Sequence, residues 1–406
     1  MDVQVRPISA DEYDTFARVS VEAFGATFRP GELDAFRVEA ELGWSIAAFD
    51  GSAMVGTTSA ASFDLTVPGA VVPSVGVTAV GVLPTHRRRG ILSALMRKQL
   101  DDLRDSGKPV AILHASEAAI YPRFGYGMAT LEGSLDIQTQ HSTFGSRLEP
   151  AGAVRLLDEQ EGLRTVPTVH ERLCRDWPGF VSRSPEWWRH RFSIPEVHRQ
   201  DYGDHFYALY EGEAGPEAYA VYRRRHRWPD DMPADEIEVT ELLATTDRGW
   251  AAMWRYLLDT DLVGLVHADG RPLDEPLLHL VAEPRRLRLR VGDGLWLRIV
   301  DVAEALSARR YRAAGPLVIH VEDDFCPWNA GRYELEAGEE GASWRSSEAD
   351  PDLLLKASDL GALYLGGISA SALHRAGRIV EAAPGAVQRA DAMFGWTPAP
   401  WCPEHF

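Results

Sequence analysis

The hydrophobic pattern of the first 150 residues switches between a strand period and a helix period. Alternating or continuous apolar runs predict strands over Val3–Ile8, Val71–Leu83 and Val110–His114. Between the last two strands, Ile91–Ser106 has apolar side chains at the spacing of an amphipathic helix. The order strand, loop, helix, strand predicts a β-α-β unit.

The later pattern predicts further strands and helices. Trp250–Asp259 has the spacing of an amphipathic helix, and Leu317–Val321 that of a strand. Leu287–Val291 and Leu295–Val300 alternate across the glycine-bearing turn at 292–294, which predicts a hairpin. The basic run at 223–227 has no glycine after it, so we expect a solvated strand end there and not a phosphate-binding loop.

A length of 406 residues suits two to four domains. A Pro/Gly-containing stretch at 147–152 and a change of pattern near 283–290 mark two boundaries. We therefore predict domains at 1–150, 151–287 and 288–406. The mixture of strands and helices in each segment predicts an α/β (α+β) fold class.

Composition narrows the class of protein. The net charge of −18 argues against nucleic acid as a partner and favours cationic small molecules such as amines. Three separated cysteines give neither a disulfide framework nor a thiolate metal site, so we expect no metal. The sequence has no signal-peptide pattern and no apolar run long enough for a membrane, so we expect a cytoplasmic protein without a membrane partner.

The strongest local signal follows the predicted strand that ends near Val82. His86-Arg87-Arg88-Arg89-Gly90 connects this strand to a helix that begins at Ile91. A helix N-terminus offers unpaired N–H groups and partial positive charge, and arginines add charge that suits phosphate oxygens. The spacing matches neither a nucleoside triphosphate loop nor a dinucleotide fingerprint.

This loop resembles the pyrophosphate loop of the GNAT N-acetyltransferases, with Arg87-x-x-Gly90-x-Leu92 after Val80-Gly81-Val82. About thirty residues later, 116–127 resemble the second GNAT signature, in which a tyrosine precedes a Gly-aromatic pair. Segments at 84–90, 114–117, 293–299 and 363–366 extend the similarity to the enhanced intracellular survival (Eis) family.

The resemblance implies tandem GNAT domains with mixed, mainly antiparallel sheets, the second lacking the Arg/Gly loop. It implies a third, sterol-carrier-protein-like α+β domain that ends in a docked C-terminus, and assembly as a homohexamer. Acetyl-CoA would be the co-substrate. The residues implied to contact it are Val80, Gly81, Val82, Arg87, Arg88, Arg89, Gly90, Ile91, Leu92, Ser93, Ser116 and Glu117.

The resemblance also implies the acid and the base of a direct acetyl transfer. Tyr121 would be the general acid, because a phenol with a pKa near 10 is protonated at neutral pH. The C-terminal carboxylate of Phe406 would be the general base, with Glu404, His405 or water as rivals. His114 is expected to be a core histidine rather than a catalytic relay.

These implications predict an acyltransferase that acetylates amines, with aminoglycosides, at one or more positions, as the expected substrates and antibiotic resistance as the associated property. Protein lysines or polyamines are the alternative acceptors. A lipid- or sterol-binding module with an inactive GNAT part is the alternative from another class.

Overall fold

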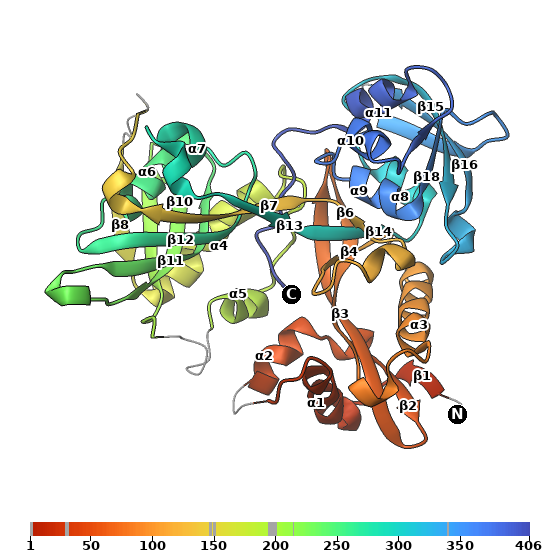
Figure 1. The fold of residues 1–406 in the computed structure, drawn as a ribbon, viewed down its shortest axis with the longest axis horizontal. Helices are drawn as coiled ribbons and strands as arrows, with labels where there is room; N and C mark the ends of the chain where they lie inside the picture. Colours follow the sequence, from red (N-terminus) through yellow and green to blue (C-terminus); the bar gives the residue numbers. More distant parts are fainter. Residues whose placement is uncertain are drawn as a thin grey trace. The chain divides into compact units, whose positions relative to one another are not determined.

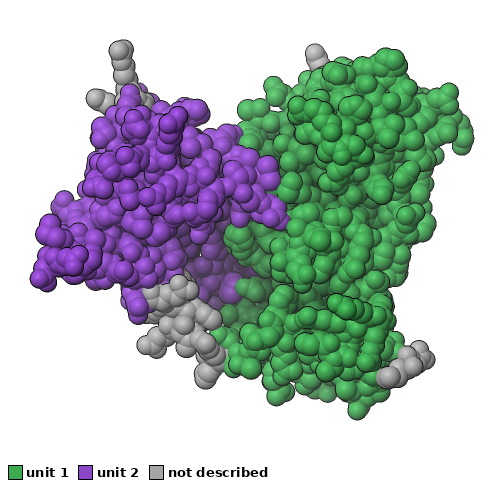
Figure 2. All heavy atoms as spheres, viewed as in Figure 1, with its two compact units in different colours: residues 1–130, 294–400, 404–406 green, residues 131–293, 401–403 purple. Residues whose placement is uncertain are grey.

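The computed structural model describes residues 3–28, 32–145, 148, 152–193, 201–213, 215–338 and 341–406. The predicted boundary at 150/151 lies outside these residues. The chain forms two compact units, shown in green and purple in Figure 2. Unit 1 comprises Met1–Thr130, Gly294–Pro400 and Glu404–Phe406, and unit 2 comprises Leu131–Asp293 and Trp401–Pro403.

The first sheet of unit 1 has seven strands (Figure 1). In spatial order they are β1 (Val3–Pro7), β2 (Ile46–Asp50), β3 (Ala53–Val67), β4 (Ala70–Val82), β5 (Val110–His114), β14 (Leu295–Ile299) and β6 (Gly127–Met128). All neighbours are antiparallel except β4 and β5. This parallel pair is connected through a helix, as the β-α-β prediction requires.

Two irregularities in β4 open the sheet at one end. The register between β3 and β4 shifts beside Ala79, which has a φ of 53°. The parallel pairing of β4 with β5 covers only three residues and ends at Gly76 opposite Ile112. Beyond this point β4 continues to Val82 without pairing to β5.

Helices of unit 1 cover this sheet. They are α1 (Tyr13–Ala23), α2 (Glu32–Glu39) and α3 (Ile91–Asp105), with short 3-10 turns at Ala10–Glu12, Leu42–Trp44, Pro84–His86 and Tyr121–Phe124. The apolar face of α3 is buried, with Leu95, Met96 and Leu100 inaccessible to solvent. Helix α1 approaches β4 closely, because a Cβ at Gly81 would lie 2.6 Å from the Cβ of Ala23.

The rest of unit 1 forms a five-stranded sheet with its own helices. The strands, in spatial order, are β17 (Gly341–Ser346), β16 (Gly331–Gly338), β15 (Gly315–Glu322), β18 (Leu353–Lys356) and β19 (Val380–Glu381). The helices are α8 (Val302–Ala308), α9 (Ala357–Leu363), α10 (Ala370–Arg375) and α11 (Ala386–Phe394). Phe325 and Trp328 of this part pack against the core that includes Phe124 and Met96.

Unit 2 has a second seven-stranded sheet. The strands, in spatial order, are β13 (Arg290–Asp293), β7 (Leu131–Gln138), β12 (Val263–Arg271), β11 (Asp235–Ala244), β10 (Gly215–Arg225), β9 (Phe206–Gly212) and β8 (Ala153–Leu157). The helices are α4 (Glu159–Cys174), α5 (Pro185–Arg191), α6 (Asp247–Leu258) and α7 (Leu277–Leu280). Trp401 completes its core against Trp177 and Phe180.

The predicted hairpin over 287–300 is wrong. Strand β13 pairs with β7 in unit 2, whereas β14 pairs with β5 and β6 in unit 1. Two adjacent alternating segments around a glycine have the sequence pattern of a hairpin, but the pattern does not encode the partner of each strand. The structure consequently divides the chain at 130/131 and 293/294, where the sequence predicted 150/151 and 287/288.

The strands and helices predicted for the first 150 residues are present, and the mixed, mainly antiparallel sheets of the predicted α/β class are confirmed. Among the described residues, no helix combines the length and the apolar character that crossing a membrane requires.

Candidate functional site

The loop before α3 exposes the N-terminal end of that helix. Arg88 and Gly90 both have left-handed backbones, with φ of 62° and 81°. Gly90 is the N-cap and offers no side chain to the first N–H groups of α3. The backbone donors of Ile91, Leu92 and Ser93 are therefore available to an anion at the end of a four-turn helix.

A cavity of about 430 Å³ lies beside this helix end. Its lining is Ala23, Phe24, Val80, Gly81, Val82, His86, Arg87, Arg88, Gly90, Ile91, Leu92, Ser93, Ser116, Glu117, Ile120, Tyr121 and Arg123. Every residue that the sequence analysis assigned to acetyl-CoA lines the cavity except Arg89. Tyr121 also lines it, whereas Phe406 is not among the lining residues.

The three arginines of the loop differ in role. Arg87 donates from Nε to the carbonyl oxygen of Val82 and from Nη2 to that of Ala23. These bonds tie the loop to β4 and to the end of α1. Arg88 lines the cavity with an exposed side chain, whereas Arg89 is exposed and is not among the residues that line the cavity. These hydrogen bonds within the protein therefore compete with the phosphate contacts that were expected for the Arg87 guanidinium.

Tyr121 begins a tight turn after β5. The 3-10 turn Tyr121–Phe124 ends at Gly125, whose φ of 84° reverses the chain. Tyr121 is 6% exposed, and its ring meets that of Tyr126 edge-on at 5.9 Å. Burial raises the pKa of the Tyr121 phenol, and Glu117 raises it further, while a hydrogen bond with Ser116 opposes the shift. The phenol is therefore protonated at neutral pH.

A buried ion pair lies under this turn. Arg298 of β14 donates to Asp323 at 2.6 Å, and both side chains are at most 2% exposed. A Cβ at Gly125 would lie 1.9 Å from Nη1 of Arg298, so glycine is required for the guanidinium to fit below the turn. Asp323 also accepts a hydrogen bond from the backbone N–H of Cys326. The pair thus connects the Tyr121 turn to the chain after β15.

The C-terminus lies on the first sheet. The Phe406 ring packs against Phe63 at 5.2 Å and edge-on against His114 at 5.1 Å. Glu404 is fully buried, and His405 is exposed with its ring 4.5 Å from that of His114. Burial lowers the pKa of His114 to about 3, and His405 adds to this shift. His114 is therefore neutral at physiological pH, as expected for a core histidine.

Several cavity residues were not identified from the sequence. Ala23 and Phe24 end α1, sixty residues before the loop, and reach the cavity because α1 packs on Gly81. No motif connects them with the loop, so packing alone places them there. Ile120 and Arg123 flank Tyr121 within the second motif, where their proximity to the tyrosine was a usable signal.

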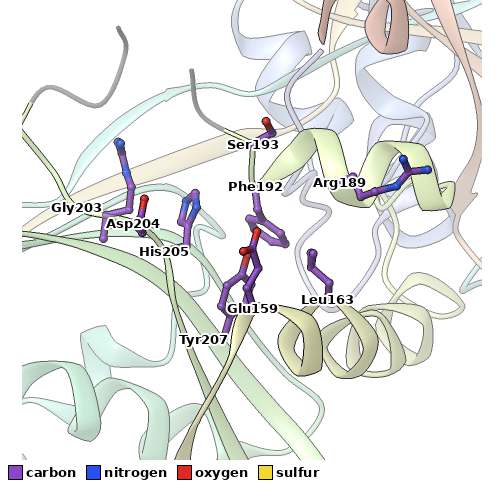
Figure 3. A pocket seen from close by; sticks show the side chains of 10 residues that line it. Glu159, Leu163, Arg189, Phe192, Ser193, Gly203, Asp204, His205 and Tyr207 are labelled. Atoms are coloured by element: carbon purple, nitrogen blue, oxygen red, sulfur yellow. The ribbon is translucent and has the colours of Figure 1, made fainter. Parts of the chain in front are cut away.

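A second cavity, of about 580 Å³, lies in unit 2 (Figure 3). Its lining includes Arg189 of α5 together with Glu159, His205 and Tyr207. Arg223 also lines it, but this guanidinium is buried and bonded to Glu238, so the solvated end predicted for the basic run is wrong at this residue.

Comparison with known families assigns all three parts of the chain. Residues 4–129 and 179–299 match families described as "Acetyltransferase (GNAT) domain". Residues 302–403 match the family described as "Sterol carrier protein domain". The tandem GNAT architecture with a sterol-carrier-protein-like third part is confirmed.

Individual relatives agree with these matches. The chain is 40% identical over 415 residues to an "Uncharacterized N-acetyltransferase" of Streptomyces avermitilis, with 100% of both chains covered. It is 35% identical to "N-acetyltransferase Eis" of Mycobacterium tuberculosis, covering 85% of this chain and 84% of that one. The crystal structure of Eis1 from Mycobacterium abscessus superposes with a TM-score of 0.86 at 35% identity, over 100% of both chains. The chain is an acyltransferase that belongs to the Eis family of GNAT N-acetyltransferases.

Proposed function

We propose that this enzyme transfers the acetyl group of acetyl-CoA directly to the amine of a small cationic substrate, most readily an aminoglycoside. The supporting observation is that one cavity is lined both by the uncapped N-terminal end of α3 and by the turn that carries Tyr121. Acetyl-CoA supplies an activated thioester, and the cavity has one end suited to its pyrophosphate and another suited to its sulfur.

The binding residues fit this co-substrate. The N–H groups at Ile91, Leu92 and Ser93 suit the pyrophosphate oxygens, and Arg88 adds charge to the same end. The unpaired side of β4 at Val80–Val82 offers backbone donors and acceptors to the amide-bearing pantetheine arm. Ser116 and Glu117 line the opposite wall.

The reaction requires three proton movements. The substrate nitrogen forms a bond to the acetyl carbon while the carbon–sulfur bond breaks, and the departing thiolate takes the proton of the Tyr121 hydroxyl. The nitrogen loses a proton as the amide forms, and this proton restores the Tyr121 phenol through solvent. The raised pKa of Tyr121 keeps that proton in place until the sulfur becomes negative. The ammonium of the substrate must first lose a proton, which we assign to the C-terminal carboxylate of Phe406.

Two other candidate bases are less suited. Glu404 is fully buried. His114, which was expected to be a core residue, is a weak acceptor for the proton of an ammonium because its pKa is low. His405 and water stay as alternative bases. An ordinary terminal carboxyl is also a weak base, so it would act through its position beside the amine. The net charge of −18 favours polycationic acceptors and supports the aminoglycoside class.

The test is acetyl-CoA-dependent thiol release by protein with a free C-terminus, measured with aminoglycosides, polyamines and lysine peptides. We expect release with several aminoglycosides and mass increments of one or more acetyl groups. Release with polyamines or lysine peptides alone would replace the proposed acceptor and keep the chemistry. Bound lipid without affinity for acetyl-CoA would instead favour the carrier alternative.

We also propose that the enzyme assembles as a homohexamer, as the Eis resemblance implies. Light scattering coupled to size-exclusion chromatography should give six times the 44.9 kDa chain mass. A monomeric mass across micromolar concentrations would contradict this assembly.

A further inference from the structure

The C-terminal ring lies directly on the backbone of a strand. A Cβ at Gly76 would be 2.6 Å from Cε2 and 2.7 Å from Cδ2 of Phe406, closer than side chains approach one another. Gly76 lies within β4 and has no positive φ, so its backbone suits any residue. The same Cβ would lie 2.7 Å from Cε2 of Phe63. The absence of a side chain is therefore needed for the Phe406 and Phe63 rings, and not for the conformation of the strand.

Two aromatic side chains enclose the same ring. Phe63, on the neighbouring strand β3, has its ring centroid 5.2 Å from that of Phe406. His114, at the end of β5, meets it edge-on at 5.1 Å. The His114 imidazole also lies 4.5 Å from the His405 ring, tilted by 39°, and forms a hydrogen bond with the backbone of Glu404. Three strands of one sheet thus hold the last three residues.

The position of this ring within the sheet is informative. Gly76 is the last residue of β4 that pairs with β5, and beyond it the two strands separate. The separated ends continue to Val82 and, past His114, to the Tyr121 turn. The chain terminus is therefore fixed at the point where the two sides of the candidate site diverge.

We propose that Gly76, Phe63 and His114 form an aromatic seat whose function is to position the terminal carboxylate of Phe406 for acetyl transfer. This inference rests on the proposed role of that carboxylate as the base. The seat explains how a weak base contributes. The ring is held on three strands, so the carboxylate, which is one bond from the Cα of Phe406, has little freedom. Gly76, Phe63 and His114 are positioning residues.

The test combines Gly76→Ala, Phe406→Ala and the double variant, with Gly292→Ala as the control. The control site lies on β13 in unit 2, has no positive φ and has open space where a Cβ would be. We expect Gly76→Ala and Phe406→Ala each to lower kcat by up to about 100-fold. The dissociation constant of acetyl-CoA should match the control for both variants, and the melting temperature should match it for Phe406→Ala, which adds no atoms.

The kcat of the double variant shows whether the two single changes act through one shared contact or lower activity independently. Because both single changes remove the same ring-to-strand contact, the double variant should be no slower than the worse single variant. The proposed seat would be overturned if the loss of kcat in the double variant equalled the product of the two single losses. It would also be overturned if either folded single variant kept the wild-type kcat. Phe406→Ala keeps every residue of the sheet, so it decides the question even where Gly76→Ala fails to fold.

Failure of the seat can be separated from failure of the proposed function. No turnover of wild-type enzyme with any amine would overturn the proposed function and the seat together. If a variant with a short peptide appended after Phe406 turned over as fast as the wild type, the carboxylate would be excluded as the base. The proposed seat would then be excluded as well. Loss of turnover with the appended peptide, together with full activity of Gly76→Ala and Phe406→Ala, would overturn the seat alone.

Discussion

At the residue scale, burial controls the protonation of the groups beside the candidate site. Tyr121 is 6% exposed and has a raised pKa, whereas His114 has a pKa lowered to about 3. Both shifts have desolvation as their largest cause, because a low-dielectric environment disfavours the charged form of either group. One residue therefore retains a proton to donate, and the other remains neutral.

Tyr121→Phe should reduce kcat by about 100-fold or more with little change in the affinity for acetyl-CoA. The change removes a hydroxyl that donates a proton but keeps the buried ring. Steady-state kinetics with any accepted amine and calorimetric titration of acetyl-CoA measure the two effects. Tyr126→Phe is the matched control, since its buried hydroxyl has no hydrogen-bond partner among the described residues. Unchanged turnover of Tyr121→Phe would exclude the acid role.

His114 should make the fold sensitive to acid. Its pKa is about 3 in the folded protein and near 6.5 when unfolded, so the unfolded state binds one more proton between these values. Stability should therefore be complete above pH 6.5 and fall toward pH 3, by up to about 1.4 kcal/mol per pH unit from this group. Urea unfolding of His114→Gln should show a smaller slope with pH than the wild type.

The control for this prediction is His279→Gln, at an exposed position of α7. This variant should keep the wild-type dependence on pH. An identical slope for wild type and His114→Gln would show that the His114 pKa is close to its ordinary value in the folded protein.

At the element scale, β14 connects the first sheet to the third part of the chain. Its Arg298 crosses under the Tyr121 turn and forms the buried pair with Asp323, beyond β15. A buried pair is costly to break because the remaining charge has no compensation. The Tyr121 turn and the third part should therefore depend on one another for stability.

Arg298→Met should lower the free energy of unfolding by about 3–5 kcal/mol, because it leaves Asp323 charged and buried. The double variant Arg298→Met, Asp323→Asn should recover much of this loss, since Asn keeps an acceptor for the N–H of Cys326. Arg345→Met, in a pair whose arginine is 73% exposed, should cost far less than Arg298→Met, because solvent screens the pair. Denaturant unfolding measures all three, and equal losses for Arg298→Met and Arg345→Met would contradict this account.

At the scale of the whole molecule, neither unit is a continuous segment of sequence. Unit 1 uses residues before 130 and after 294, and unit 2 includes Trp401–Pro403 near the end of the chain. The chain leaves unit 1 after Thr130 and returns to it at Gly294. These two residues are adjacent in space, because the N–H of Gly294 donates to the carbonyl oxygen of Thr130 at 3.1 Å. A domain drawn as one segment therefore lacks part of its sheet.

A chain that joins residues 1–130 to 294–406 through two glycines should fold, whereas residues 1–150 alone should aggregate. The shorter chain lacks β14, which is buried along its whole length, and so exposes an apolar edge at β5. Circular dichroism and size-exclusion chromatography distinguish a folded species from an aggregate. A stable monomer of residues 1–150 would contradict the role of β14.

Local sequence signals were sufficient for the elements near the cofactor loop. The strand to Val82, the glycine at 90 and the amphipathic period of α3 each follow from local sterics and burial, so the loop and its cavity residues could be predicted. The aromatic seat could not, because Gly76 is an unremarkable strand residue until the distant Phe406 lies on it. Arg89, assigned by its motif position, lies outside the cavity lining.

The sequence by itself determined the local elements and the motifs that line the cavity, since these depend on local periodicity and residue chemistry. The family and the three kinds of domain followed from the resemblance that these motifs carry. The tertiary structure alone decided which strands pair, that β13 and β14 enter different sheets, and that the C-terminal ring rests on Gly76. The physical reason is that strand pairing and close packing join residues far apart in the chain. Alternation along one strand specifies its buried face but not its neighbour.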